Sequence, residues 1–512
     1  MKIRTLIIIL LLAASCSKWL DVTPDNAISD KNLFATGQGF RNALNGIYLN
    51  MASDELYGKE LSWGFMSAVS QQYCQTDEIE NPLYQDASKL LYNTVQTEPV
   101  VTAFWEKGYK IIANTNKLLE EIEGVPTTAF EYGRDEKELI IAEALAIRAL
   151  MHFDLLRLFA PSPESDPSGK YLPYKDNYKT LVSERLTVGE FIQKIISDLD
   201  KAGTTLLRFD TVTHPSAMYS SGMNSTSSKW SARYRFASTL YVDNMGAFFW
   251  YRGLRLNILS VKALQAIVYL YAGRAYYNNA EAIAKELYEI YHKEKNWVGF
   301  TEEKDIKGKP DSRYTKLYDD VLFGLYRNRL AKDYYDKVWM SSSNTTRLPL
   351  ANIESLFASD NTGLFSDYRL TYLIGNTNET DSKYFSLKYV EPNDKDIEET
   401  EGSLVPIIRF SEICHILAEI SARNGDISKG IEYLDEVRSA RGARRNLSLT
   451  VKDGQQLMEE IILDIRKEDL GEGRTFFTYK RLNLDRIPNS DGKGDIQARG
   501  GYVLPIPISE TI

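Results

Sequence analysis

The chain has 512 residues, enough for one large domain or several smaller ones. Hydrophobic residues make up 43% of it and charged residues 26%, as is usual for a folded globular protein. The formal charge of −9 argues against nucleic acid as a main partner and against polyanionic sugars as the default ligand, although it leaves room for a local basic patch.

The N-terminal residues indicate export. Lys2 and Arg4 precede an apolar run, residues 6–14, that is too short to cross a bilayer as a helix. Small residues follow and lead directly to Cys16, an arrangement that resembles a bacterial lipoprotein signal. We therefore predict that residues 1–15 are a signal peptide and that Cys16 carries the lipid anchor. The alternative is an ordinary secretory signal with an incidental cysteine.

Helical periodicity dominates the next part of the chain. Apolar residues recur every three or four positions, which places them on one face of a helix. The predicted helices cover residues 40–51, 105–119, 142–156 and 188–202. Thr187 and Glu190 have the spacing of a capping box at the start of the last of these.

Two helix pairs, residues 263–291 and 410–437, share one pattern. In each, a small residue lies seven positions before a glycine: Ala266 precedes Gly273, and Ala418 precedes Gly425. Small residues allow two helices to pack closely, and glycine ends a helix in a left-handed turn. The pattern predicts helix hairpins similar to tetratricopeptide repeats.

Long polar stretches separate these helices, and several carry aromatic residues. Tyrosine is unusually common, with 32 Tyr against 20 Phe. Its ring suits half-hydrated binding surfaces, but a helical core with many hydroxylated rings explains the same count. Cys74 and Cys414 could pair with each other, although we interpret both as small buried hydrophobic residues.

The sequence favours a binding protein over an enzyme. The four histidines lie far apart, and we interpret His152 and His415, on apolar helical faces, as core residues. The chain contains no HExxH, CxxC, GxGxxG, P-loop or nucleophile-elbow motif, so we expect no catalytic residues, metal or cofactor. A carboxylate pair of a helical glycoside hydrolase remains an alternative.

Several different short motifs are spread along the whole mature chain. They are DVTP at 21–24, GFRNALNGIY at 39–48, Trp105 with Tyr109, Ile112 and Asn116, AEALAIRA at 142–149, PIIRFSE at 406–412 with Ala418 and Glu419, RKEDLGEGR at 466–474 with KRL at 480–482, and LPIP at 504–507. In this order, and behind a lipoprotein signal, they resemble the SusD/RagB family of outer-membrane nutrient-binding lipoproteins.

The resemblance implies a mainly α SusD-like fold, built on tetratricopeptide-like hairpins with a loop-rich ligand face. Residues 16–512 would form a single domain, with an N-terminal part at about 16–215 and a C-terminal part at about 260–512. The protein would sit on the cell surface, anchored in the outer membrane. There it would capture oligosaccharides for polysaccharide utilisation, or peptides as RagB-like relatives do, and deliver them without catalysis to a SusC-like TonB-dependent transporter.

The ligand site would then lie in the polar stretches, where flat rings can stack on sugar C–H faces. Family members tend to place such rings in two regions. Here these regions contain the candidate contacts Trp63, Tyr73, Tyr84, Trp297 and Tyr314. Core packing or loop anchoring is the alternative role for each ring. We expect the charged motif residues Glu143, Arg148, Glu468 and Arg474 to tie helices together rather than to contact the ligand.

Overall fold

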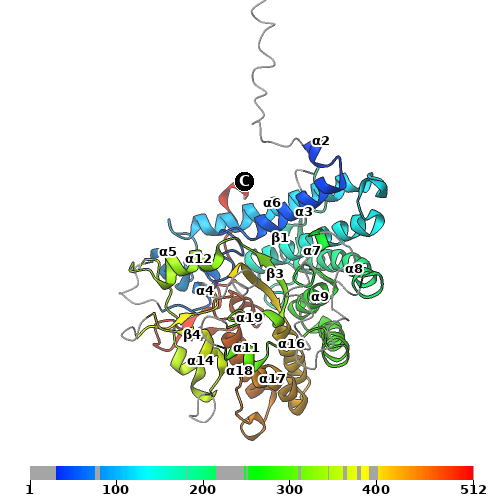
Figure 1. Cartoon of the computed structure of the whole chain (residues 1–512). Helices are drawn as coiled ribbons and strands as arrows, with labels where there is room; N and C mark the ends of the chain where they lie inside the picture. The colour runs from blue at the N-terminus through cyan, green and yellow to red at the C-terminus, as the bar shows by residue number, and fades with distance from the viewer. Residues whose placement is uncertain are drawn as a thin grey trace, which may run out of the picture.

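Helices form most of the molecule in the computed structural model (Figure 1). The structure describes residues 30–74, 81–180, 183–214, 247–249, 252–308, 313–343, 345–360, 366–377, 382–390 and 402–510. The predicted signal peptide and Cys16 lie outside these residues. The mainly α architecture that the periodicity predicts is confirmed.

The N-terminal half is a set of helices packed around one central helix. In chain order they are α2 (Asp30–Leu33), α3 (Gly37–Met51), α4 (Phe65–Val69), α5 (Pro82–Ser88), α6 (Glu98–Glu123), α7 (Gly133–Phe159) and α8 (Val188–Arg208). α7 packs against α6 and α8, and almost all of its second half is buried. The predicted capping box is present, because Thr187 and Glu190 each bond the other's backbone N–H.

The C-terminal half continues the row of helices. It contains α9 (Ile258–Ala272), α10 (Tyr277–Lys285), α11 (Glu303–Ile306), α12 (Leu330–Tyr334), α13 (Ile353–Phe357), α14 (Tyr368–Leu373), α16 (Phe410–Arg423), α17 (Ile427–Ala440), α18 (Gly454–Glu468) and α19 (Thr475–Arg481). Both predicted hairpins are found, α9 with α10 and α16 with α17. Gly273 and Gly425 have φ of +94° and +80° at their turns. α10 runs on as a π-helix to Glu294.

The strands of the described residues form four two-stranded antiparallel pairs. The pairs are β1 (Lys170–Pro173) with β2 (Arg185–Thr187), β3 (Val321–Tyr326) with β6 (Leu404–Arg409), β4 (Ile374–Gly375) with β5 (Phe385–Ser386), and β7 (Arg486–Pro488) with β8 (Asp495–Gln497). β3 and β6 also contact α9, so this pair ties the long hairpins to the loops between them.

One apolar cluster runs through the molecule, with members from Phe40 to Leu504. Much of the tyrosine surplus belongs to this core, since Tyr73, Tyr334 and Tyr389 are among its largest fully buried side chains. Cys414 is buried and Cys74 partly buried, and neither forms a disulfide. In the described part of the chain, every helix is too short or too polar to cross a membrane.

Gly473, the second glycine of the C-terminal signature, occupies a position that no other residue fits without strain. Gly473 has φ of +73°, and a Cβ there would lie 2.5 Å from the Leu61 carbonyl oxygen and 2.7 Å from that of Ser62. We expect Gly473→Ala to lower the free energy of unfolding by roughly 1–3 kcal/mol, because both the backbone strain and the clash must be accommodated. Urea unfolding measures the loss. Gly46→Ala, with no atom within 4 Å of its Cβ, serves as the control, and equal losses for the two would contradict this account.

Candidate functional site

The charged motif residues form buried ion pairs, as the sequence predicts. Glu143 accepts from Arg252 and Arg255, each at 2.9 Å. The Arg252 guanidinium also bonds Asp210 at 2.9 Å, and none of the three side chains of Arg252, Glu143 and Asp210 is exposed. We call these three residues the Arg252 cluster. It joins α7, the end of α8 and the segment before α9, so its role is structural.

The C-terminal signature forms a second buried network. Glu468 binds Arg441 at 2.8 Å and Arg369 at 2.9 Å. Glu472 binds Arg409 at 2.7 Å and Lys388 at 2.6 Å. Burial alone would raise the pKa of Glu472, but the surrounding cations outweigh it and lower that pKa to about 2. These carboxylates therefore hold separate segments together.

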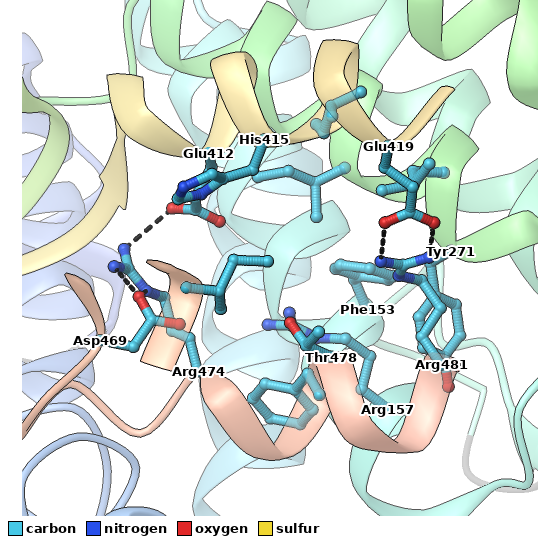
Figure 2. Close-up of a pocket in the computed structure, with 15 residues that line it drawn as sticks. Phe153, Arg157, Tyr271, Glu412, His415, Glu419, Asp469, Arg474, Thr478 and Arg481 are labelled. Atoms are coloured by element: carbon cyan, nitrogen blue, oxygen red, sulfur yellow. Dashed lines mark hydrogen bonds and ion pairs between the residues drawn. The ribbon is translucent and has the colours of Figure 1, made fainter. Parts of the chain in front are cut away.

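A small cavity lined by both apolar and charged side chains lies beside this network, between α16 and α19 (Figure 2). Glu419 on α16 is bound by Arg481 on α19, and Arg474 is bound to Glu412 at 2.8 Å. The cavity has a volume of about 80 Å³, which has room for a few water molecules. Ligand sites usually have volumes of several hundred Å³. The size of the cavity and its internally paired charges make it part of the scaffold.

The structure brings three of the predicted ligand rings together, but inside the core. Trp63, Tyr73 and Tyr84 are 2%, 1% and 2% exposed. Tyr73 donates a hydrogen bond to the Trp63 carbonyl, and the Tyr73 and Tyr84 ring centroids are 6.5 Å apart. Trp63 also packs edge-on against Tyr334, at 5.2 Å. These rings anchor the segment after α3 and present no open face for stacking.

The other two predicted residues lie apart from that cluster. Trp297 is 7% exposed and packs on Tyr291, with ring centroids 5.5 Å apart. Tyr314 is half-buried, and its backbone N–H donates to the Asp305 carbonyl. The structure therefore does not gather the five predicted rings into one surface, because the segments that carry them fold back onto the helices.

An open groove of about 970 Å³ lies beside α6, and we call it the α6 groove. One wall is α6, the other is the segment that includes β1 and β2, and Ser509 and Glu510 close one side. Figure 1 shows the C-terminal end of the chain near α6. The lining residues of the groove are Trp105, Glu106, Tyr109, Lys110, Ala113, Asn116, Pro173, Lys175, Asn177, Tyr178, Lys179, Thr180, Ser183, Arg185, Ser509 and Glu510.

Two side chains of α6 donate hydrogen bonds to the backbone of residues 173–176, which we call the floor of the groove. Tyr109 Oη donates to the Pro173 carbonyl at 3.0 Å, and Asn116 Nδ2 donates to the Lys175 carbonyl at 2.9 Å. Asn116 is itself held by Arg148, which donates to its amide oxygen at 2.8 Å. These motif residues, which the sequence suggests are purely structural, thus also hold the floor of the groove in place.

Two side chains of α7 complete this attachment. The His152 Nε2 accepts from the Lys175 backbone N–H at 3.0 Å, while its Nδ1 lies 2.9 Å from the Arg148 carbonyl. Burial lowers the pKa of His152 to about 3, so the ring is neutral and can accept this hydrogen bond. Arg148 donates to the Asp176 carbonyl at 2.9 Å. The floor, residues 173–176, is therefore held rigidly before any ligand arrives.

The groove offers rings and polar groups together. Tyr178 is 46% exposed and Tyr109 is half-buried, whereas Trp105, which packs against Tyr109 with ring centroids 4.8 Å apart, is 4% exposed. Lys117 Nζ lies 5.1 Å from the Tyr178 ring centroid. Flat rings next to amides, hydroxyls and charged groups suit a ligand with both C–H faces and hydroxyls.

Sequence reasoning missed Tyr178. Its signal is a tyrosine within a polar run, Asp176-Asn177-Tyr178-Lys179, which lies between a short strand and the capping box of α8. The described residues contain no cluster of His, Cys, Asp or Glu suited to a metal ion.

Comparisons with known families match most of the chain. A family model described as "Starch-binding associating with outer membrane" matches residues 18–241, and one described as "SusD family" matches residues 360–502. The SusD-like protein P2 of Formosa agariphila is 23% identical over 544 aligned residues, covering 99% of this chain and 96% of that protein.

Solved structures share the fold over nearly their whole length. A SusD superfamily protein of Bacteroides thetaiotaomicron has a TM-score of 0.66 at 21% identity, covering 93% of this chain and 97% of that one. A putative sugar binding protein of Bacteroides vulgatus has a TM-score of 0.65 at 20% identity, covering 93% and 96%. At these identities the likeness shows a common fold.

Proposed function

Because this chain belongs to the SusD/RagB family, a family of sugar-binding proteins, we propose that it captures oligosaccharides at the cell surface and delivers them to a SusC-like TonB-dependent transporter. Cys16, following the predicted signal peptide, would carry the lipid that anchors the protein in the outer membrane. The family model's association with the outer membrane supports this location.

We place the oligosaccharide in the α6 groove. The observation that carries this assignment is an exposed tyrosine, Tyr178, next to a floor whose backbone is hydrogen-bonded by three buried side chains and by the half-buried Tyr109. A preorganised floor avoids the entropy cost of ordering a loop on binding. The groove's volume of about 970 Å³ suits several sugar rings rather than one.

The proposed role is binding without a chemical step. The buried carboxylates of the motifs are bound by arginines and lysines inside the scaffold, where they serve packing. The family to which the chain belongs is described by binding. Incubation with a bound oligosaccharide should therefore yield no shortened product.

Replacing the exposed ring tests the site. We expect Tyr178→Ala to weaken oligosaccharide binding roughly 2- to 12-fold, because a stacked ring contributes about 0.5–1.5 kcal/mol beyond area burial. Isothermal titration calorimetry with the best ligand of a glycan array measures the change. Tyr326→Ala is the matched control, since Tyr326 is 59% exposed and does not line the groove.

Three outcomes would overturn parts of this proposal. Equal affinities for wild type and Tyr178→Ala would move the ligand away from the α6 groove. Binding of peptides, with no glycan of the array retained, would favour the RagB-like alternative. Failure of a SusC-like protein from the same organism to co-purify with the lipidated chain would remove the delivery step.

A further inference from the structure

The α6 groove is a basic region on an acidic protein. The whole chain has 61 Lys and Arg against 70 Asp and Glu. The groove lining reverses this balance, with the four cations Lys110, Lys175, Lys179 and Arg185 against the two carboxylates of Glu106 and Glu510. The groove where a ligand would lie therefore has a net positive charge, whereas the whole chain has a net negative charge.

The cations come from both sides of the groove. Lys110 belongs to α6, whereas Lys175, Lys179 and Arg185 belong to the opposite segment, on or near β1 and β2. The net positive charge is therefore concentrated on the opposite segment, because Glu106 on α6 offsets Lys110. Such focusing raises the local concentration of an anion and discriminates against a cation.

These cations differ from the buried arginines in their partners. The Lys110 side chain makes no ion pair or hydrogen bond with the residues that the structure describes. Arg185 donates at 3.1 Å to the Glu510 backbone carbonyl rather than to a carboxylate. Lys179 has an 88% exposed side chain and lies 3.7 Å from Glu120, a loose pair that water competes for.

The remaining cation is fixed at the floor. The Lys175 backbone is bonded to both Asn116 and His152, and its Nζ donates to the Thr180 carbonyl at 3.5 Å. Burial lowers the pKa of Lys175, while the nearby Glu510 carboxylate raises it. An incoming anion would add a second favourable charge to this partly buried amine.

We propose that the α6 groove selects anionic oligosaccharides, chains that carry carboxylates or sulfates next to hydroxyls. This inference rests on the proposed function and names the class of sugar. Tyr178 stacks on a sugar ring whatever the charge of the sugar, whereas Lys110 and Arg185 stabilise only a sugar that carries an anionic group. Stacking and charge selection are therefore carried by different side chains and can be separated by substitution.

Matched pairs of probes test the proposal. One pair is tetragalacturonate and its fully methyl-esterified form, and the other is a sulfated carrageenan tetrasaccharide and its desulfated form. We expect wild type to bind the charged member of at least one pair about 3- to 10-fold more tightly at low ionic strength. The pair that shows the preference identifies carboxylate or sulfate. Raising the salt concentration should reduce it.

Variants locate the preference. The double variant Lys110→Gln, Arg185→Gln should bring the ratio of the affinities for the charged and neutral probes close to one. Lys332→Gln, which alters an exposed lysine on α12 outside the groove, should keep the full preference. Tyr178→Ala should weaken both members of the pair, so its effect reports the site and not the charge.

Two results overturn the inference and differ from a failure of the proposed function. If neutral and charged probes bind wild type equally and Tyr178→Ala weakens both, the groove binds sugars but ignores charge. If neither charged probe binds while a neutral glycan from the array does, the groove's cations serve another role. Absence of binding by every glycan of the array overturns the proposed function itself.

Discussion

Arg252→Met is expected to lower the free energy of unfolding by about 3–5 kcal/mol, because it removes one partner of a fully buried ion-pair cluster. Asp210 would keep only the Ile258 backbone N–H, at 2.8 Å, while its carboxylate stays buried. Glu143 would keep Arg255. Burial already raises the pKa of Asp210 in the intact cluster, so without the guanidinium this carboxyl would take up a proton at a cost in stability.

Two further variants make this expectation specific. Arg134→Met removes an exposed arginine that pairs with Glu138 on the surface of α7, and it should change the free energy of unfolding far less than Arg252→Met does, as is usual for exposed pairs. Adding Asp210→Asn to Arg252→Met should recover part of the loss, because no bare carboxylate then remains buried. Urea unfolding compares the three, and a loss for Arg252→Met no larger than that for Arg134→Met would contradict the role of the cluster.

The protein should lose stability steeply below pH 4.5, and Glu472 should account for about 3 kcal/mol of the loss. Its pKa is about 2 in the folded chain against 4.5 as the ordinary value. A lowered pKa contributes stability that is fully present above pH 4.5 and is lost as the pH falls through about 2. Asp469 acts in the opposite sense, because burial raises its pKa to about 6 and its contribution is lost as the pH rises from 3.8 through 6.

Melting temperatures by scanning calorimetry between pH 7 and pH 2.5 measure this dependence. Glu472→Gln should melt at a lower temperature at pH 7, since Arg409 and Lys388 lose their charged partner. Its melting temperature should fall less than that of wild type between pH 4.5 and pH 2.5. Parallel curves for the two proteins would show that another carboxylate is responsible.

The fold could be predicted from the sequence because its signals are local. Apolar spacing marks α3, α6 and α7, and glycines with positive φ end α9 and α16 where the sequence places the turns. The charged motif residues were also predictable as helix ties, since long charged side chains on apolar helix faces must find partners. What spacing does not reveal is which partners these are, such as Arg252 for Glu143 across 109 residues.

The ligand rings could not be predicted in the same way. An aromatic residue in a polar stretch is compatible with stacking on a ligand and with anchoring a loop, and only the packing of that loop decides. Trp63 and Tyr73 are buried because the segment after α3 folds onto Tyr334 and its neighbours. Tyr178 is exposed because side chains of α6 and α7 bind the backbone of the segment just before it. Its exposure therefore depends on those helices and not on the local sequence.

Those backbone attachments bear on how such proteins diversify. Tyr109, Asn116, Arg148 and His152 all bind main-chain atoms of residues 173–176, so none of their hydrogen bonds depends on which side chains that segment carries. Substitutions at its solvent-facing positions can therefore accumulate without penalty to folding. Point substitutions there would change the lining of the groove, while the helices beneath stay the same.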